Sequence, residues 1–295
     1  MPDTLIAHVS DTAFGIAHYR ALETQRPDAL FHDPLAGLLA GDRGQKIGAA
    51  MPASFMKGWP VVIRTCVIDD YIRLAIAQGV DTVLNLGAGL DTRPYRMEIP
   101  EPLVWIEIDY PHIITFKEEQ LSGEKPRCQL QRVRLDLADV SERRKVLASI
   151  IADARVEKML VLTEGVVPYL SMEEAASLAD DLKMLPQVRY WIVDYFSPAI
   201  NEFRQHLAKR KMRNAPFKFT PEDWFGFFRE HGWRPNEIRY LAEEGERLGR
   251  PAQLPLFYKI LFALQGWFAS RRRRAAFMRL IGYVLLEPTA SGGIA

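Results

Sequence analysis

The sequence has few cysteines and no cluster of side chains suited to a metal ion. Only Cys66 and Cys128 occur among its 295 residues, and this excludes a disulfide framework. The six histidines are scattered, and no two lie four residues apart as zinc-binding histidines on a helix do. We therefore expect no metal site formed by protein side chains.

The sequence also lacks long apolar runs and has no large excess of positive or negative charge. The longest uncharged run, Ile260 to Ser270, is shorter than the ~20 residues that a membrane-spanning helix needs. The first residues lack the basic and apolar pattern of a secretory signal, so we expect a cytoplasmic protein. Lys and Arg number 38 against 37 Asp and Glu, and a net charge of +1 gives no basis for a nucleic-acid partner.

Short apolar runs alternate with helical stretches through the middle of the chain. This alternation predicts an α/β fold, a Rossmann-like parallel sheet with helices on both faces and an added helical cap. Two later runs, 238–241 and 282–286, are candidates for further strands. The five expected core strands are residues 82–86, 103–108, 129–135, 158–163 and 189–193.

Local signals predict where several helices begin and end. We expect a helix from Arg64 to a left-handed stop at Gly79. Ser171 followed by Glu174 predicts a capping box at the start of another helix. Thr220 as the cap and Pro221 at the first helical position predict the start of a third helix. The basic stretch 198–213 is expected to form a fourth helix.

We expect one single domain over residues 1–295, since single cores stop growing near ~250–300 residues. Within it we expect an N-terminal helical cap over 1–63 and a cofactor-binding core over 64–194. Residues 195–295 would then form a cap on the acceptor side together with the late strands. Four prolines interrupt the helical pattern of the first cap: Pro27, Pro34, Pro52 and Pro60.

Glycine or carboxylate residues follow four of the predicted strands, at the edge where parallel sheets bind ligands. Gly87-Ala88-Gly89 follows the first strand, where glycine lets the backbone approach a ligand. Asp109 lies twenty residues past Gly89, the usual spacing for a carboxylate that binds both ribose hydroxyls. Asp136 is suited to an adenine amino group, with the backbone N–H of Leu137 beside it. Glu164 follows the fourth strand.

The glycine turn does not match a phosphate-binding loop. Thr92 stands where a dinucleotide fingerprint has its third glycine, and the nearby Asp91 would repel a pyrophosphate. The ligand that fits is an adenosine with a zwitterionic, phosphate-free tail, and this is S-adenosylmethionine. Its carboxylate favours an arginine fork.

Four strings carry a resemblance to a known family: LNLGAGLDTRPYR, WIEIDYPHIITFKEEQL, VRLDLAD and LTEGVVPYLS. They resemble the leucine carboxyl methyltransferases, a family of class I S-adenosylmethionine enzymes. The upstream strings YRALETQRPDALFHDPLAG and IRTCVIDD are similar to the N-terminal region of the same family. The resemblance covers about residues 14–200.

The resemblance implies roles for individual residues. Arg64 would hold the methionine carboxylate with help from Arg20, and Glu164 would face the amino-acid end of the cofactor. Arg93 would brace the loop instead of touching the ligand. The implied cofactor-binding set is Arg20, Arg64, Gly87, Ala88, Gly89, Asp109, Asp136, Leu137 and Glu164.

The resemblance also implies methyl transfer to oxygen, and we expect the carboxylate of a small organic molecule as acceptor. A carboxylate is ionised at neutral pH and needs no general base, whereas a phenol with a pKa near ~10 would benefit from one. The sequence does not identify a catalytic base, although Tyr169, Asp194 and His206 lie after the fourth and fifth strands.

Three alternatives stay open at this point. The first is a phenolic O-methyltransferase of specialised metabolism. The second is a non-catalytic cofactor-binding or partner protein, for which the apolar stretch Phe257–Phe268 would be an interface. The third, a nicotinamide oxidoreductase, is disfavoured by Thr92. The arginines 271–274 invite a membrane or nucleic-acid interpretation, but with a near-zero net charge we expect neither contact.

Overall fold

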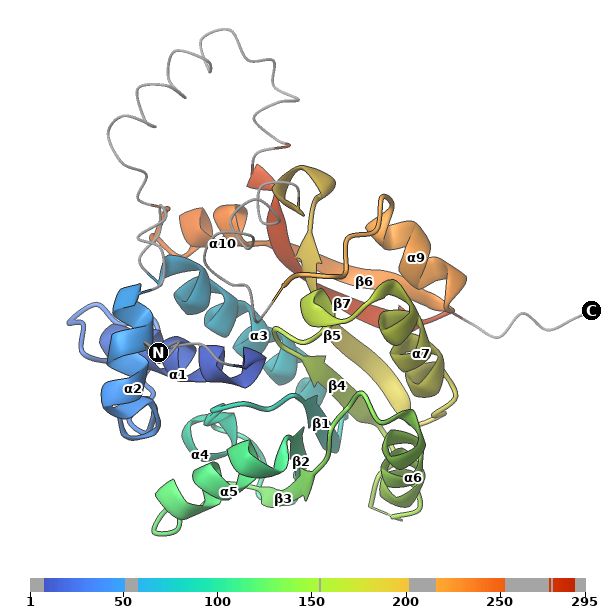
Figure 1. The fold of residues 1–295 in the computed structure, drawn as a ribbon, viewed down its shortest axis with the longest axis horizontal. Coiled ribbons are helices and arrows are strands. Elements are labelled where there is room, and N and C mark those ends of the chain that lie inside the picture. Colours follow the sequence, from blue (N-terminus) through green and yellow to red (C-terminus); the bar gives the residue numbers. More distant parts are fainter. Residues whose placement is uncertain are drawn as a thin grey trace, which may run out of the picture.

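The computed structural model describes residues 8–50, 58–153, 155–201, 216–252, 276 and 278–289. These residues form a seven-stranded sheet in the order β3-β2-β1-β4-β5-β7-β6, with helices on both sides (Figure 1). The chain order reverses between β1 and β4, which makes this pair the topological switch point of the sheet. Ligands of open α/β sheets bind at such a point, beyond the carboxyl ends of the strands.

The first five strands are parallel, and β7 pairs antiparallel with both β5 and β6. The inner strands β1, β2 and β4 are buried along their whole length, as their apolar runs predict, whereas the edge strand β3 has exposed positions. The strands are β1 (Thr82–Leu86), β2 (Val104–Asp109), β3 (Gln129–Arg134), β4 (Met159–Thr163), β5 (Val188–Phe196), β6 (Trp233–Tyr240) and β7 (Ile281–Pro288).

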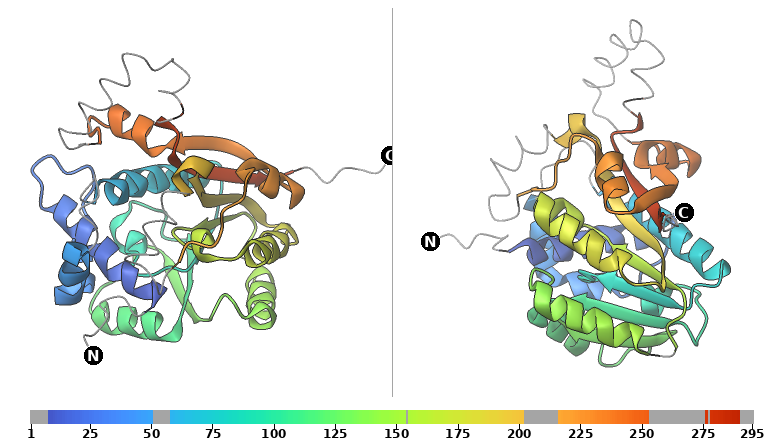
Figure 2. Two further views of the ribbon diagram at one scale, coloured as in Figure 1. Left: turned by 45° about the horizontal axis from the view of Figure 1, so that its top comes forward. Right: turned by 90° about the vertical axis from the view of Figure 1, so that its right-hand side faces the viewer.

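Two apolar cores cover the two faces of the sheet. On one face α6 (Val140–Ile151), α7 (Met172–Lys183) and α9 (Trp224–Glu230) pack around Trp191 and Trp233. On the other face α3 (Trp59–Ala77), α10 (Leu241–Arg247) and Trp105 of β2 contribute to a second core. Figure 2 shows α6 and α7 on the opposite side of the strands from α3. Three-layer packing of this kind buries the central strands on both faces.

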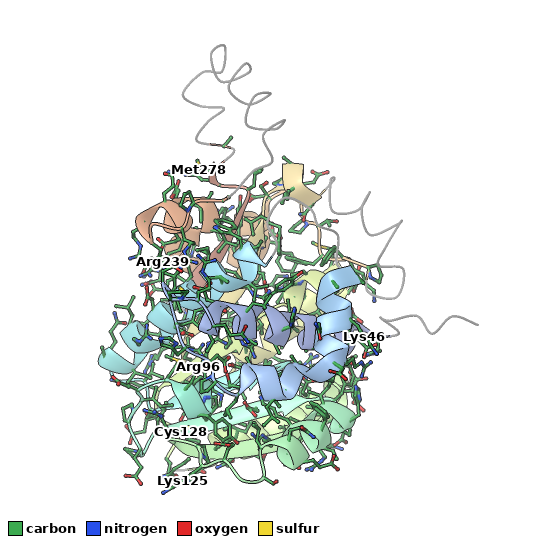
Figure 3. The ribbon with its side chains drawn as sticks, turned by 90° about the vertical axis from the view of Figure 1, so that its left-hand side faces the viewer. Lys46, Arg96, Lys125, Cys128, Arg239 and Met278 are labelled. Atoms are coloured by element: carbon green, nitrogen blue, oxygen red, sulfur yellow. The ribbon has the colours of Figure 1, made fainter. Side chains whose placement is uncertain are left out.

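A third core joins the N-terminal helices to the sheet. Helix α1 (Thr12–Thr24) packs along α2 (Ala36–Ala50), and both contact α5 (Pro111–Gln120) through side chains such as Phe14 and Leu39. A short helix, α4 (Arg93–Arg96), follows the glycine turn after β1. Two 3-10 turns complete the described elements, η1 (Val9–Asp11) before α1 and η2 (Val167–Tyr169) after β4. Figure 3 looks onto this side of the molecule, with Arg96 between the N-terminal helices and the sheet.

The five predicted core strands are confirmed within three residues at each end, but several other boundaries were predicted wrongly. Helix α3 begins at Trp59, not at Arg64, because Pro60 takes the first turn of a helix, where its missing N–H costs nothing. Gly79 does stop that helix, with φ +87°. The late strands are longer than expected, and Leu241 begins α10.

The helix predicted at Thr220 also starts elsewhere. Helix α9 begins at Trp224, and its N-cap is Asp223, whose carboxylate accepts from the Gly226 N–H at 2.8 Å. Most of the predicted helix 198–213, the stretch Phe257–Phe268 and the arginines 271–274 lie outside the described residues. None of the helices in the described part of the chain combines the length and the apolar composition that a membrane span requires.

The capping box of α7 is confirmed. The Ser171 hydroxyl accepts from the Glu174 N–H at 3.2 Å, and the Glu174 carboxylate accepts from the Ser171 N–H at 2.6 Å. These bonds satisfy two donors that the helix itself leaves unpaired.

Replacing Ser171 by Ala should therefore lower the free energy of unfolding by about 1 kcal/mol, measured by urea denaturation. Ser149→Ala is the matched control, because its exposed hydroxyl bonds the Val146 carbonyl within α6. An equal loss of stability in the two variants would contradict a specific role of the cap.

Candidate cofactor-binding and active site

A cavity of about 390 Å³ opens at the carboxyl ends of β1, β2, β3 and β4. It lies at the switch point of the sheet and is covered on one side by η1 and α1. All nine residues of the predicted cofactor-binding set border it, so the structure brings them together. These nine are Arg20, Arg64, Gly87, Ala88, Gly89, Asp109, Asp136, Leu137 and Glu164.

The glycine turn forms the floor of the cavity beside β1. Gly87 and Gly89 have φ of +70° and +47°, a left-handed backbone that favours glycine. The N–H groups of Gly87 and Ala88 both donate to the Ile108 carbonyl, which fastens the turn to β2. A Cβ on Gly87 would lie 2.4 Å from the Val166 side chain, so glycine is also required for the β1 and β4 loops to pack.

Asp109 ends β2 and points toward the glycine turn. Its Oδ2 accepts from the Gly89 N–H at 2.6 Å, and its Oδ1 accepts from the Tyr110 N–H at 2.7 Å. Burial raises the pKa of this carboxyl, and the two N–H groups oppose the rise. Helix α5 has no side-chain cap, so Asp109 is not there to cap it. Each carboxylate oxygen keeps a further acceptor position for a hydroxyl group.

Asp136 and Leu137 border the cavity where β3 ends. Asp136 is exposed, and its Oδ1 accepts from the Ala138 N–H at 2.9 Å. The N-cap of α6 is Asp139, which accepts from the Glu142 N–H. Asp136 is therefore not the helix cap that an aspartate in this position often is.

Arg64 and Glu164 meet beside the glycine turn. Arg64 projects from α3 and is largely buried, and its Nε lies 2.9 Å from Glu164 Oε1. Burial alone would lower the pKa of Arg64, but the charge of Glu164 outweighs it and raises that pKa. The pair does not have hydrogen-bonding geometry at Nε, so this buried N–H lacks a hydrogen-bond acceptor among the described residues.

Arg93 holds together three segments that surround the site, as predicted. Its guanidinium reaches three carboxylates: Asp69 on α3 at 2.7 Å, Asp91 in the glycine loop at 2.9 Å and Glu164 after β4 at 2.9 Å. Burial would raise the pKa of Asp91, but Arg93 outweighs it and holds that pKa well below its usual range. Arg93 does not border the cavity.

Arg20 attaches α1 to the same edge of the sheet. Its Nε donates to Asp33 at 2.8 Å and its Nη2 donates to the Leu90 carbonyl at 2.5 Å. Asp33 also faces Arg96, which pairs with Asp69 at 2.6 Å. A continuous series of buried ion pairs therefore joins the N-terminal helices to α3, α4 and the end of β4.

The three candidate bases have different positions. Tyr169 borders the cavity. Asp194 does not border it and is buried, where its carboxylate accepts from Tyr283 at 2.7 Å and from the Gly165 N–H at 2.9 Å. His206 lies outside the described residues.

Apart from Arg20 and Arg64, sequence reasoning missed the parts of the cavity wall that do not follow a strand. His8, Val9 and Ser10 border the cavity from η1 and the residue before it, and the His8 ring lies edge-on to Tyr110 with centroids 4.9 Å apart. Pro216 and Lys218 border it from the segment before α9. No motif marked these residues, and only their position in the fold identifies them.

Three features fit S-adenosylmethionine. The buried Arg64 N–H that lacks an acceptor suits a carboxylate, and the left-handed glycines leave space for a close ligand. Asp109 offers a carboxylate at the position that binds ribose in sheets of this kind. With the sheet order, these features define a class I S-adenosylmethionine-dependent methyltransferase.

Comparison with known proteins identifies the family. The family model described as leucine carboxyl methyltransferase matches residues 13–183, which is more than half of the chain. The chain therefore belongs to the leucine carboxyl methyltransferase family.

Relatives and solved structures agree with this assignment. A protein from a Parafrankia species is 33% identical over 90% of this chain and 88% of its own length. A protein from Frankia alni is 30% identical over 85% of this chain and 92% of its own length. The names of both place them among S-adenosyl-L-methionine-dependent methyltransferases. The crystal structure of a DUF574 family protein from Streptomyces avermitilis has the same fold, with a TM-score of 0.55 and 15% identity over 98% of this chain and 99% of that one.

Replacing Arg93 by Met should lower the free energy of unfolding by about 3–5 kcal/mol, because it leaves three buried carboxylates short of a partner. Urea denaturation measures the change. Arg155→Met is the control, since Arg155 pairs with Asp153 at the surface and should matter little. Equal stability of the two variants would contradict the bracing role.

Replacing Asp109 by Ala should weaken the affinity for S-adenosylmethionine more than about tenfold, because a charged hydrogen-bond acceptor is lost. Asp109→Asn keeps an oxygen that can accept from the Gly89 N–H, so it should weaken the affinity for S-adenosylmethionine less. Calorimetric titration measures both affinities, with Asp139→Ala as a control outside the cavity. Unchanged affinity in folded Asp109→Ala protein would contradict the ribose assignment.

Proposed function

We propose that this protein transfers a methyl group from S-adenosylmethionine to a carboxylate oxygen of a small organic acid in the cytoplasm. Neither a nucleic acid nor a membrane is part of the proposal. The proposal rests on the residues of the cavity wall, taken from the cofactor end to the acceptor end.

The predicted set supports a definite orientation of the cofactor. Arg64, with Arg20 beside it, would hold the methionine carboxylate, and Glu164 would face the amino group. Asp109 would hold the ribose hydroxyls, and Asp136 with Leu137 would hold adenine. The turn Gly87-Ala88-Gly89 would lie under the methionine part.

The acceptor end then lies beyond β4. Adenosine would extend over β2 and β3, because Asp109 and Asp136 end those strands. The cavity wall on the other side is formed by Gly165, Val166 and Tyr169, which follow β4, and by Pro216 and Lys218. This sequence of strands supports an acceptor that approaches from the β4 side.

When bound, S-adenosylmethionine would supply a methyl group on a positively charged sulfur: an acceptor oxygen in line with the methyl–sulfur bond can bond to the methyl carbon as that bond breaks, and the sulfur leaves as a neutral thioether. The protein's contribution is to hold the two reactants in line and to exclude water. The turn η1 and helix α1 cover the cavity and suit the second task.

The observation that carries the proposal is that each acidic side chain bordering the cavity already has a partner. Asp91 and Glu164 pair with Arg93, and Asp109 accepts from Gly89. Asp136 accepts from Ala138, and Glu174 belongs to the capping box of α7. A carboxylate acceptor needs none of them as a base, since it is ionised at neutral pH. A phenol, by contrast, would benefit from one.

The proposal predicts transfer to carboxylic acids at a rate that changes little between pH 8 and pH 6, because their pKa lies near ~4. The measurement offers S-adenosylmethionine with a labelled methyl group to matched panels of carboxylic acids and phenols. Methyl esters release the label as methanol in strong alkali, whereas phenol ethers keep it. Alkali-stable product, formed faster at pH 8 than at pH 6, would contradict the proposal.

A further inference from the structure

Lys218 lies at the acceptor end of the cavity, on a segment that the fold fixes in place. Its backbone N–H donates to the Pro168 carbonyl at 3.0 Å, and the next N–H, of Phe219, donates to the same oxygen. The rings of Phe217 and Tyr169 stack with centroids 5.0 Å apart. Residues 217–219 are therefore attached to η2, the turn that follows β4.

Lys218 differs from the other two cations that border the cavity. Arg20 pairs with Asp33 at 2.8 Å, and Arg64 pairs with Glu164 at 2.9 Å. Lys218 has no ion pair with any residue that the structure describes. Lys218 is exposed and borders the cavity, so its charge is accessible to a charged ligand there.

In the proposed orientation, no part of the cofactor needs the positive charge of Lys218. Asp136 and Asp109 end strands β3 and β2, whereas Lys218 is attached to the turn after β4, on the far side of β1. The proposed orientation assigns the methionine carboxylate to Arg64 and Arg20. The positive charge of Lys218 is therefore free to bind the acceptor.

We infer that Lys218 binds the carboxylate of the acceptor and so selects organic acids over neutral molecules. The inference rests on the proposed function. Val166, Tyr169 and Leu170 border the same part of the cavity and offer apolar surface to the body of the acid. A lysine ammonium is a compact point charge, which can hold one carboxylate oxygen while the other reacts.

The charge change during the reaction predicts where the effect of Lys218 is seen. The new bond is only partly formed in the transition state, so the acceptor carboxylate keeps much of its negative charge there and the ammonium binds the starting acid and the transition state about equally. Interactions of this kind lower KM without raising kcat. Lys218 is thus a specificity-determining residue, and its loss should raise KM and leave kcat little changed.

The test measures KM and kcat for an acid that the wild-type protein esterifies, together with the affinity for S-adenosylmethionine. Lys218→Gln should raise KM at least about tenfold, while kcat and cofactor affinity stay within about twofold. Lys218→Arg keeps the charge and should restore most of the affinity for the acid. Lys125→Gln is the matched control, because Lys125 is an exposed lysine at the edge of the molecule, outside the cavity (Figure 3).

The outcomes separate this inference from the proposed function. Esterification of acids by wild type with an unchanged KM in Lys218→Gln would overturn the inference and leave the proposed function standing. An equal loss of cofactor affinity in that variant would also overturn it, since Lys218 would then serve the cofactor. Wild-type protein that methylates phenols but no acid would overturn the proposed function itself.

Discussion

The contact on which the site depends is the buried guanidinium of Arg93. It joins a carboxylate of α3, one of the glycine loop and one after β4, and these three segments supply Arg64, the glycine turn and Glu164 to the cavity. The charges in this buried series of ion pairs compensate one another, because it contains four arginines and four acids. They are Arg20, Arg64, Arg93 and Arg96 with Asp33, Asp69, Asp91 and Glu164. Breaking such a series is costly because a buried charge is left without its partner. The cavity is therefore positioned by electrostatics as much as by apolar packing.

Much of the fold was predictable because the signals were local or periodic. The inner strands are continuous apolar runs, as strands buried on both faces must be, and Ser171 with Glu174 fixes the start of α7. The starts of α3 and α9 were mispredicted where two signals compete. Pro60 begins a helix instead of breaking one, and Asp223 caps α9 in preference to Thr220.

Apart from Arg20 and Arg64, the predicted site residues converge because parallel strands end at one edge of the sheet, so that residues at the ends of β1, β2, β3 and β4 must lie close together. Residues that reach this edge from elsewhere could not be predicted in that way. His8 and Lys218 come from segments before α1 and α9, and only tertiary packing brings them to the cavity. The ion pairs of Arg93 likewise depend on the three-dimensional approach of α3, which the spacing of residues does not show.

The most direct test of the account is a calorimetric titration of the wild-type protein with S-adenosylmethionine, with NADH as the control ligand. The cavity, with its buried Arg64, its glycine turn and Asp109, predicts micromolar binding of S-adenosylmethionine and none of NADH. Folded protein that does not bind S-adenosylmethionine, or that binds NADH equally well, would contradict the assignment of this cavity.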